Sequence, residues 1–164
     1  MRRFGSVSGD RLAGVEPAAW GAAQLMIALH DTAKLFHEFG YVQSQAHRSI
    51  GWRPFSRAGG MVPPGAMVGV VFDLNDAEHT EVCVGVVLAW RDDQFVVHGD
   101  VTVDDPLPIR GGTGNQRFLV DLPEIRTPSL DECLAAVRDY TTRLCAYTSV
   151  LDDLGIPRTR PRPS

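Results

Sequence analysis

Two stretches of alternating side chains, residues 82–90 and 95–103, constrain the fold of this chain most. Large apolar residues occupy every second position up to Trp90 and again from Phe95, with Gly99 as the exception. A turn across Asp92 and Asp93 joins the stretches into a hairpin with Trp90 opposite Phe95. The other pairs follow from this register: Leu88 with Val97, Val84 with Val101 and Val82 with Val103. One face of the hairpin, the first face, is therefore apolar, which is the arrangement that fixes register.

A further strand on each side extends this sheet. Residues 67–74 run back along the first stretch with Phe72 opposite Val82, and residues 116–122 alternate in the same way. The apolar residues that they add to the first face are Val70, Phe72, Phe118, Val120 and Leu122. The sequence thus predicts a four-stranded antiparallel meander.

One helix precedes the sheet and another follows it. Apolar residues spaced by three and four predict a first helix that begins near Pro17 and stops at Gly40. Its predicted buried stripe is Ala18, Ala22, Leu25, Leu29, Ala33 and Phe36. Ser129 and Glu132 form a capping box at the start of the second helix, and Gly155 ends it. Both helices are expected to cover the first face.

These elements predict an α+β fold in the order α-β-β-β-β-α. A chain of 164 residues with 44% hydrophobic and 22% charged residues fits one domain with a substantial core. We place that domain at residues 15–156, between a flexible N-terminal lead (1–14) and a disordered Pro/Arg tail (157–164). No stretch is long and apolar enough to suggest a membrane span.

The opposite side of the sheet, the second face, is less polar than a solvent-exposed face should be. It carries Met67, Val71, Val87, Ala89, Val96 and Leu119 beside Cys83, His98 and Thr102. Residues 41–65 show no period and are predicted to be a long loop that contains Trp52 and Phe55. We expect this loop to cover the second face; a homodimer that buries the face is the alternative.

Charge is unevenly distributed along the chain. Between residues 73 and 105 there are nine carboxylates and a single arginine, Arg91. This polarity favours a basic protein partner, although solvated strand ends and turns give a similar pattern. The predicted partner-binding residues are Asp92, Asp93, Glu81, Asp100 and Asp104, with Trp52 as an aromatic anchor. A net charge of −4 argues against a nucleic-acid partner.

A small-ligand pocket is the competing interpretation. Glycine weakens strands, so Gly69 and Gly85, adjacent on the second face, indicate either curvature or space for a ligand. Such a pocket would lie between this face and residues 41–65, with His98 as acid or base and Arg53 or Arg57 holding an anion.

The sequence carries no catalytic signature. Cys83 and His98 are the only residues that could form a nucleophile–base pair, and a buried cysteine beside a hydrogen-bonded histidine explains them better. Asp73, Asp76, Glu78 and His79 crowd one turn without the spacing of a calcium loop, so neither a metal nor a cofactor is expected.

Cysteine and arginine usage indicates the cellular compartment and the kind of genome that encodes the chain. Three cysteines, an odd number at unrelated spacings, favour a reducing compartment such as the cytoplasm. Fifteen arginines against one lysine are typical of a GC-rich bacterial genome. We therefore expect a non-enzymatic cytoplasmic bacterial interaction protein, an immunity- or chaperone-like accessory. The alternative is a small-ligand-binding or weakly catalytic domain.

Overall fold

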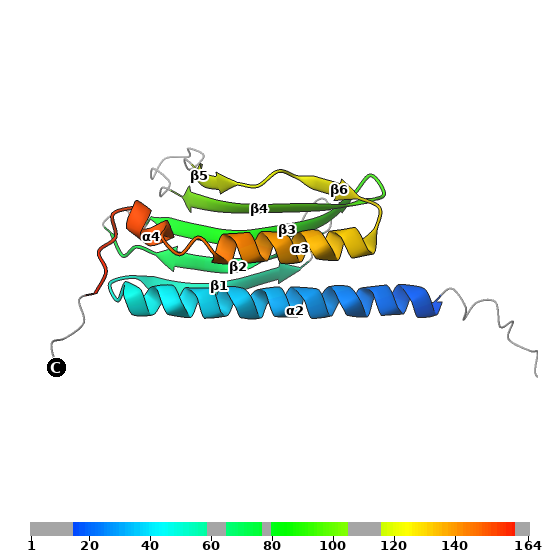
Figure 1. Cartoon of the computed structure of the whole chain (residues 1–164), viewed down its shortest axis with the longest axis horizontal. Coiled ribbons are helices and arrows are strands. Elements are labelled where there is room, and N and C mark those ends of the chain that lie inside the picture. The colour runs from blue at the N-terminus through cyan, green and yellow to red at the C-terminus, as the bar shows by residue number, and fades with distance from the viewer. Residues whose placement is uncertain (1–14, 59–64, 77–79, 105–115, 160–164) are drawn as a thin grey trace, which may run out of the picture.

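Six antiparallel strands form one sheet in the described part of the chain, and the helices lie against a single face of it (Figure 1). The computed structural model describes residues 15–58, 65–76, 80–104 and 116–159. Its elements are α2 (Val15–Ala46), β1 (Gly51–Ala58), β2 (Gly65–Asp73), β3 (Glu81–Arg91), β4 (Gln94–Asp104), β5 (Gln116–Asp121), β6 (Ile125–Thr127), α3 (Leu130–Cys145) and α4 (Val150–Asp153). The predicted α+β class is confirmed, with one helix before the antiparallel sheet in the sequence and one after it. The described residues form six strands in place of the predicted four.

The predicted register of the central hairpin is confirmed at every position. β3 and β4 pair from Glu81 opposite Asp104 to Arg91 opposite Gln94, and β2 pairs with β3 as expected. At the turn, Asp92 and Asp93 have φ angles of 52° and 58°. Positive φ at both central residues is the geometry of a type I′ turn, whose twist matches that of the strands it joins.

The first helix is longer than predicted, because α2 continues through Gly40 to Ala46. A Cβ at Gly40 would lie 2.5 Å from the Trp52 ring and 2.8 Å from Cγ2 of Val70. Glycine therefore serves here to bring the helix close to the sheet, and the prediction that it ends the helix is wrong. Within the predicted stripe Phe36 is fully buried, whereas Ala22 is exposed.

β1 occupies the region predicted to be a loop. It pairs antiparallel with β2, with Trp52 opposite Phe72 and Phe55 opposite Gly69. Because alternate side chains of a strand point to opposite faces, Trp52 lies on the first face and Phe55 on the second. The prediction that a loop covers the second face is therefore wrong. Pro54 weakened the sequence signal, since proline is confined to edge strands such as this one.

β5 differs from its predicted register by one residue. A bulge between Val101 and Thr102 leaves Val120 opposite Val101 but places Phe118 opposite Thr102. Phe118 thus lies on the second face with 49% of its surface exposed, and its predicted place on the first face is wrong. Leu122 is buried, as expected for the first face.

The predicted capping box forms in part. Ser129 Oγ accepts the backbone N–H of Glu132 at 3.3 Å. The Glu132 carboxylate, however, accepts the hydroxyl of Thr127, and the Ser129 N–H donates to Thr127 Oγ1 at 3.0 Å. Thr127 therefore stands between the two residues that a full capping box would join.

The C-terminal helix is interrupted, because α3 ends at Cys145 and the short α4 follows. The predicted glycine stop is confirmed at the end of α4, where Gly155 has a φ of 76°. The N–H groups of Ile156 and Gly155 donate to the carbonyls of Leu151 and Asp152 at 3.0 and 2.8 Å. These two bonds form a Schellman motif.

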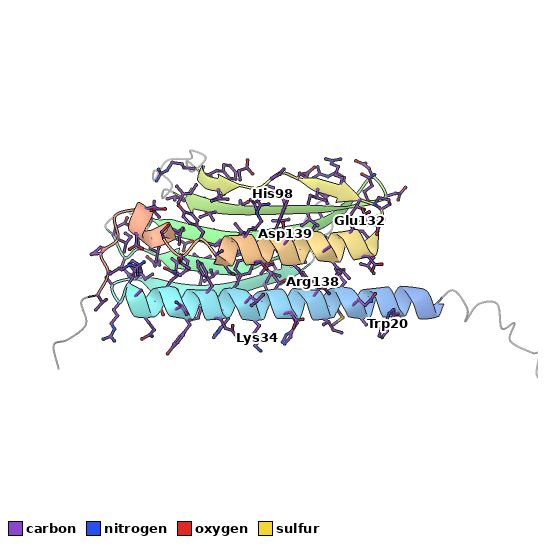
Figure 2. The ribbon with its side chains drawn as sticks, viewed as in Figure 1. Trp20, Lys34, His98, Glu132, Arg138 and Asp139 are labelled. Carbon is purple, nitrogen blue, oxygen red and sulfur yellow. The ribbon has the colours of Figure 1, made fainter. Side chains whose placement is uncertain are left out.

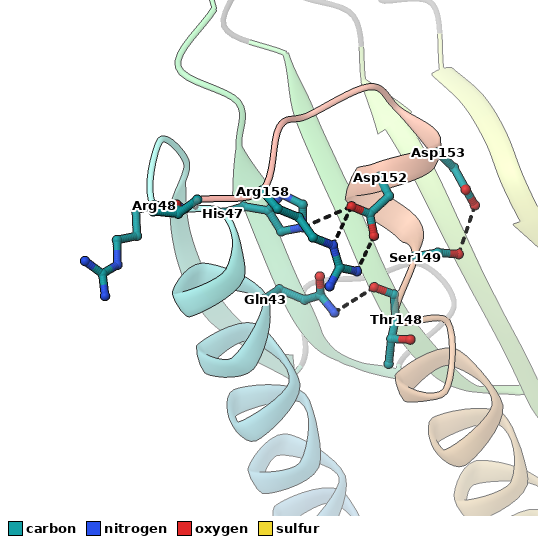
Figure 3. Close-up of polar contacts among 9 residues, drawn as sticks. Gln43, His47, Arg48, Thr148, Ser149, Asp152, Asp153 and Arg158 are labelled. Carbon is teal, nitrogen blue, oxygen red and sulfur yellow. Dashed lines mark hydrogen bonds and ion pairs between the residues drawn. The ribbon is translucent and has the colours of Figure 1, made fainter. Parts of the chain in front are cut away.

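The segment after α4 is attached to both helical ends (Figure 3). The Arg158 guanidinium binds the Asp152 carboxylate, with Nε 2.7 Å from Oδ1, and this hydrogen bond lowers the pKa of Asp152. The Thr159 N–H donates to the Ala46 carbonyl at 2.8 Å, and the Thr159 hydroxyl accepts the N–H of Arg48 at 3.0 Å. The prediction of a disordered tail is therefore wrong up to Thr159. The rest of the tail, like the N-terminal lead, lies outside the described residues.

The core lies between the helices and the first face. Its largest fully buried side chains include Phe36, Phe72, Val84, Val97, Val101, Tyr140, Leu144 and Leu151. Cys83, Cys133 and Cys145 are free. Within the described part of the chain, no helix has the combination of length and apolar character needed to cross a membrane.

Candidate functional site

Three carboxylates stand side by side on the second face, on three neighbouring strands. Asp73 of β2 is directly opposite Glu81 of β3, and Glu81 is directly opposite Asp104 of β4. We call Asp73, Glu81 and Asp104 the acidic row. Like charges directly opposite each other in a sheet are destabilising. Folding alone therefore does not account for this arrangement.

The acidic row is only partly neutralised by its surroundings. Arg53 Nη2 donates to Glu81 Oε1 at 2.8 Å, and this bond is the largest cause of the raised pKa of Arg53. Both side chains are substantially exposed, at 57% and 36%, so the pair contributes little stability. Asp104 Oδ2 accepts the Cys83 thiol at 3.7 Å, which is a weak neutral contact. Arg53 is thus the one arginine that forms an ion pair with the row among the described residues.

A groove of about 270 Å³ lies beside the acidic row on the same face. The β1 side of the groove contributes Arg53, Phe55 and Arg57, and the β4 side contributes Asp100 and Asp104. The remaining lining residues are Met67, Val71, Glu81, Cys83, Gly85, Thr102 and Gln116. The groove therefore combines an apolar floor with acidic residues on one side and arginines on the other.

His98 does not line the groove, but it bridges a second pair of opposed carboxylates, one of which does. Asp100 and Asp121 are cross-strand partners on β4 and β5. His98 Nε2 lies 2.7 Å from Asp121 Oδ1, and its Nδ1 lies 3.4 Å from Asp100 Oδ2. Burial raises the pKa of the Asp100 carboxyl above its usual 3.8; the nearby Asp121 and Asp104 raise it further, and a charge on His98 lowers it. The ionised form of Asp100 is therefore disfavoured in the folded protein.

This environment predicts that Asp100→Asn stabilises the protein at neutral pH. A carboxyl whose pKa is raised on folding contributes stability below its unfolded pKa, and that contribution is lost as the pH rises through the folded value. We expect a gain of about 0.5–1 kcal/mol at pH 7 that shrinks as the pH falls towards 3.8. Urea unfolding across this range measures it. Asp92→Asn, at an exposed turn, is the control, and an equal gain there or a pH-independent gain at Asp100 would contradict the prediction.

The two candidate catalytic residues are not brought together. Cys83 pairs with Thr102 and His98 with Val87, which is four residues, or about 13 Å, further along the sheet. Burial raises the pKa of Cys83 to about 12, with contributions from Asp104 and Glu81, so the thiol stays protonated. An un-ionised thiol without a base is a poor nucleophile. Among the described residues, no three His, Cys, Asp or Glu side chains form a group that could hold a metal ion.

The glycine patch predicted to hold a ligand is occupied by Phe55. Cβ atoms at Gly69 and Gly85 would lie 2.7 and 3.1 Å from the tip of the Phe55 ring. The two glycines therefore make room for an aromatic side chain of the neighbouring strand. Of the predicted ligand residues, Arg53, Arg57 and Gly85 line the groove.

The predicted partner-binding residues separate into distinct places. Glu81, Asp100 and Asp104 line the groove, whereas Asp92 and Asp93 occupy the turn at the far end of β3, about 35 Å from Glu81 along the strand. At this turn Asp92 Oδ2 lies 3.9 Å from Arg126 Nη1. The predicted anchor Trp52 lies on the first face against His37, with ring centroids 5.2 Å apart, so it is absent from this site.

Sequence reasoning missed Asp73 and Asp121 as members of the site. The predicted pairing of Phe72 with Val82 already implies that Asp73 lies opposite Glu81, so the signal for the acidic row was present. Asp121 lies between Val120 and Leu122, so the predicted alternation already implies that it is on the second face, but the sequence does not indicate that it lies opposite Asp100. Comparisons with protein-family models, curated proteins and solved structures each found no match for this chain.

Proposed function

We propose that this chain is a non-enzymatic interaction protein whose second face binds a basic segment of a protein partner. The acidic row carries the proposal. Two directly opposed carboxylate pairs cost about 0.2–1 kcal/mol each, and a cation bound between them would relieve that cost. Such a local conflict with stability is typical of functional surfaces.

The surroundings of the acidic row support a protein partner. Phe118 is 49% exposed on the same face, Met67 and Val87 are partly exposed there, and no helix among the described residues covers it. A partner segment could lay apolar side chains on this surface while an arginine or lysine enters the groove beside Asp100 and Asp104. This mode of action suits a small accessory protein of the bacterial cytoplasm, such as an immunity protein or a chaperone, which works by occupying a surface of its partner.

A small ligand in the groove is the second candidate. Arg57 and Asp100 line the same space, so the groove offers a cation and a carboxylate to one occupant. A small molecule with both charges would fit this chemistry.

The proposal is tested with defined peptides and two matched variants. Asp73→Asn with Asp104→Asn neutralises the acidic row and leaves the Arg53–Glu81 pair in place. Asp92→Asn with Asp93→Asn removes the same charge at the far end of β3. We expect an alternating Arg–Ser peptide to bind wild type and the Asp92/Asp93 variant alike at low salt, and about tenfold more weakly to the Asp73/Asp104 variant.

Several outcomes decide between the candidates. Equal weakening in both variants would show an effect of net charge alone and overturn the proposal, as would binding of an Asp–Ser peptide of the same length. Affinity for free arginine as strong as for the peptide would favour the small-ligand candidate. Unfolding supplies an independent check, because the Asp73/Asp104 variant is expected to be more stable than wild type by about 0.5–1 kcal/mol.

A further inference from the structure

The outer side of α2 exposes an unusual amount of apolar surface. Trp20, Met26 and Ile27 are exposed by 67%, 71% and 59% in its N-terminal half, and Tyr41 and Val42 by 54% and 58% near its end. Exposed apolar patches of this kind mark interaction surfaces. This surface is separate from the second face, because α2 packs on the first face through Gly40.

The exposed residues follow the seven-residue spacing of a helix–helix seam. Trp20, Ile27, Lys34 and Tyr41 are each seven positions apart. Positions seven apart lie on nearly the same side of a helix, as the a positions of a coiled coil do. Figure 2 shows Trp20 and Lys34 projecting from the same side of α2, away from α3. We define Trp20, Ile27, Lys34 and Tyr41 as the α2 seam.

We propose that the α2 seam binds a second copy of this chain, with the two α2 helices antiparallel. A two-fold axis that crosses α2 between residues 30 and 31 places Trp20 beside Tyr41 of the second copy. The same axis places Ile27 beside the stem of Lys34. Each contact then occurs twice, as a two-fold interface requires.

Charge complementarity favours a second copy over another occupant. Asp31 and Lys34 lie on the exposed side of α2, and neither forms an ion pair within the described part of the chain. In the antiparallel arrangement Lys34 lies one helical turn from Asp31 of the second copy, and Asp31 lies equally near Lys34 of that copy. The seam therefore complements itself in charge.

The size of the contact sets the expected affinity. The seam from Trp20 to Tyr41 covers 22 positions, or about 33 Å of helix, which is less than a standard interface uses. We therefore expect a reversible dimer with a dissociation constant of roughly 10 µM. Sedimentation velocity over a concentration series of the full chain measures it.

The deciding experiment exchanges charges between copies. Asp31→Lys places lysines against each other across the seam, and Lys34→Asp does the same with aspartates. Each variant alone should dimerise about tenfold more weakly than wild type, whereas an equimolar mixture should recover near-wild-type affinity. Only a contact between copies gives this recovery, and matching thermal melts show that both variants fold.

A second pair of variants locates the seam, with Ile27→Glu expected to abolish dimerisation. Phe118→Glu, at an apolar residue exposed by 49% on the other side of the molecule, is expected to leave it unchanged. A monomer at all concentrations, no recovery on mixing, or equal effects of these two variants would overturn the proposal. So would binding of wild type, but not Ile27→Glu, to phosphatidylglycerol vesicles, because the seam would then serve a lipid surface.

Discussion

Replacing Gly69 with alanine is expected to lower the free energy of unfolding by about 3 kcal/mol. A Cβ at this position would lie 2.2 Å from the backbone oxygen of Val84 and 2.8 Å from Cα of Gly85. Backbone cannot move aside as a flexible side chain can, so the β2–β3 pairing itself must distort. The same Cβ would also displace the Phe55 ring, which lies 2.7 Å away.

Gly51→Ala is the matched control for this experiment. Gly51 is also a strand residue, but the nearest atom to a Cβ there is Cβ of Asp73 at 3.5 Å, an ordinary contact. We expect its effect on urea unfolding to remain within about 0.5 kcal/mol. Equal losses at Gly51 and Gly69 would show that strand glycines matter only through flexibility, and would contradict the close packing at Gly69.

A similar loss is expected for Phe72→Ala, at about 3–5 kcal/mol. Phe72 is completely buried on the first face, and its ring makes an edge contact with Phe39 at a centroid distance of 6.0 Å. Truncation leaves a cavity that the rigid sheet cannot close, so the lost packing adds to the lost burial. Chemical unfolding of the full chain measures the difference.

Phe118→Ala is the control for the residue type and also tests the bulge between β4 and β5. If Phe118 lies on the second face, truncation should cost less than about 1 kcal/mol. A loss as large as that of Phe72→Ala would restore the register expected from simple alternation, with Phe118 in the core. The pair of variants thus reports which face each phenylalanine occupies.

The central strands were predictable from the sequence because apolar residues on the first face alternate with smaller or polar residues on the second. Trp90 and Phe95 alternate with polar or small residues on both sides of a two-residue turn, and only one register places their rings against each other, with centroids 4.7 Å apart. An edge strand has no such requirement. β1 carries Pro54 and exposed arginines, so neither composition nor period marked it as a strand.

Gly40 shows a second limit of structure prediction from the sequence. Glycine after an apolar stripe is the usual signal for a helix end, and the same residue allows the helix to approach a tryptophan ring. The distinction depends on Trp52, which is twelve positions away on a strand that the sequence did not reveal. A local sequence pattern cannot distinguish these two roles of glycine, because the difference lies in a tertiary contact.

The candidate site was predictable where it follows from strand register. Glu81 and Asp104 are recognisable as groove residues once β3 and β4 are paired, and Arg53 was identified from its charge. The contact between His98 and Asp121 was not, because the alternation of β5 puts Asp121 on the second face without fixing which residue of β4 it lies opposite.

The order of strands in the sheet has a consequence for synthesis on the ribosome. β2 to β5 each pair with the strand that precedes them in sequence, so the sheet can assemble as the chain emerges. α3, which packs over Gly99 through Tyr140 and Leu144, is made only afterwards. Until then a nascent chain presents the apolar residues of β4 to its surroundings. A pause in translation before residue 130 would therefore leave the chain at its greatest risk of aggregation.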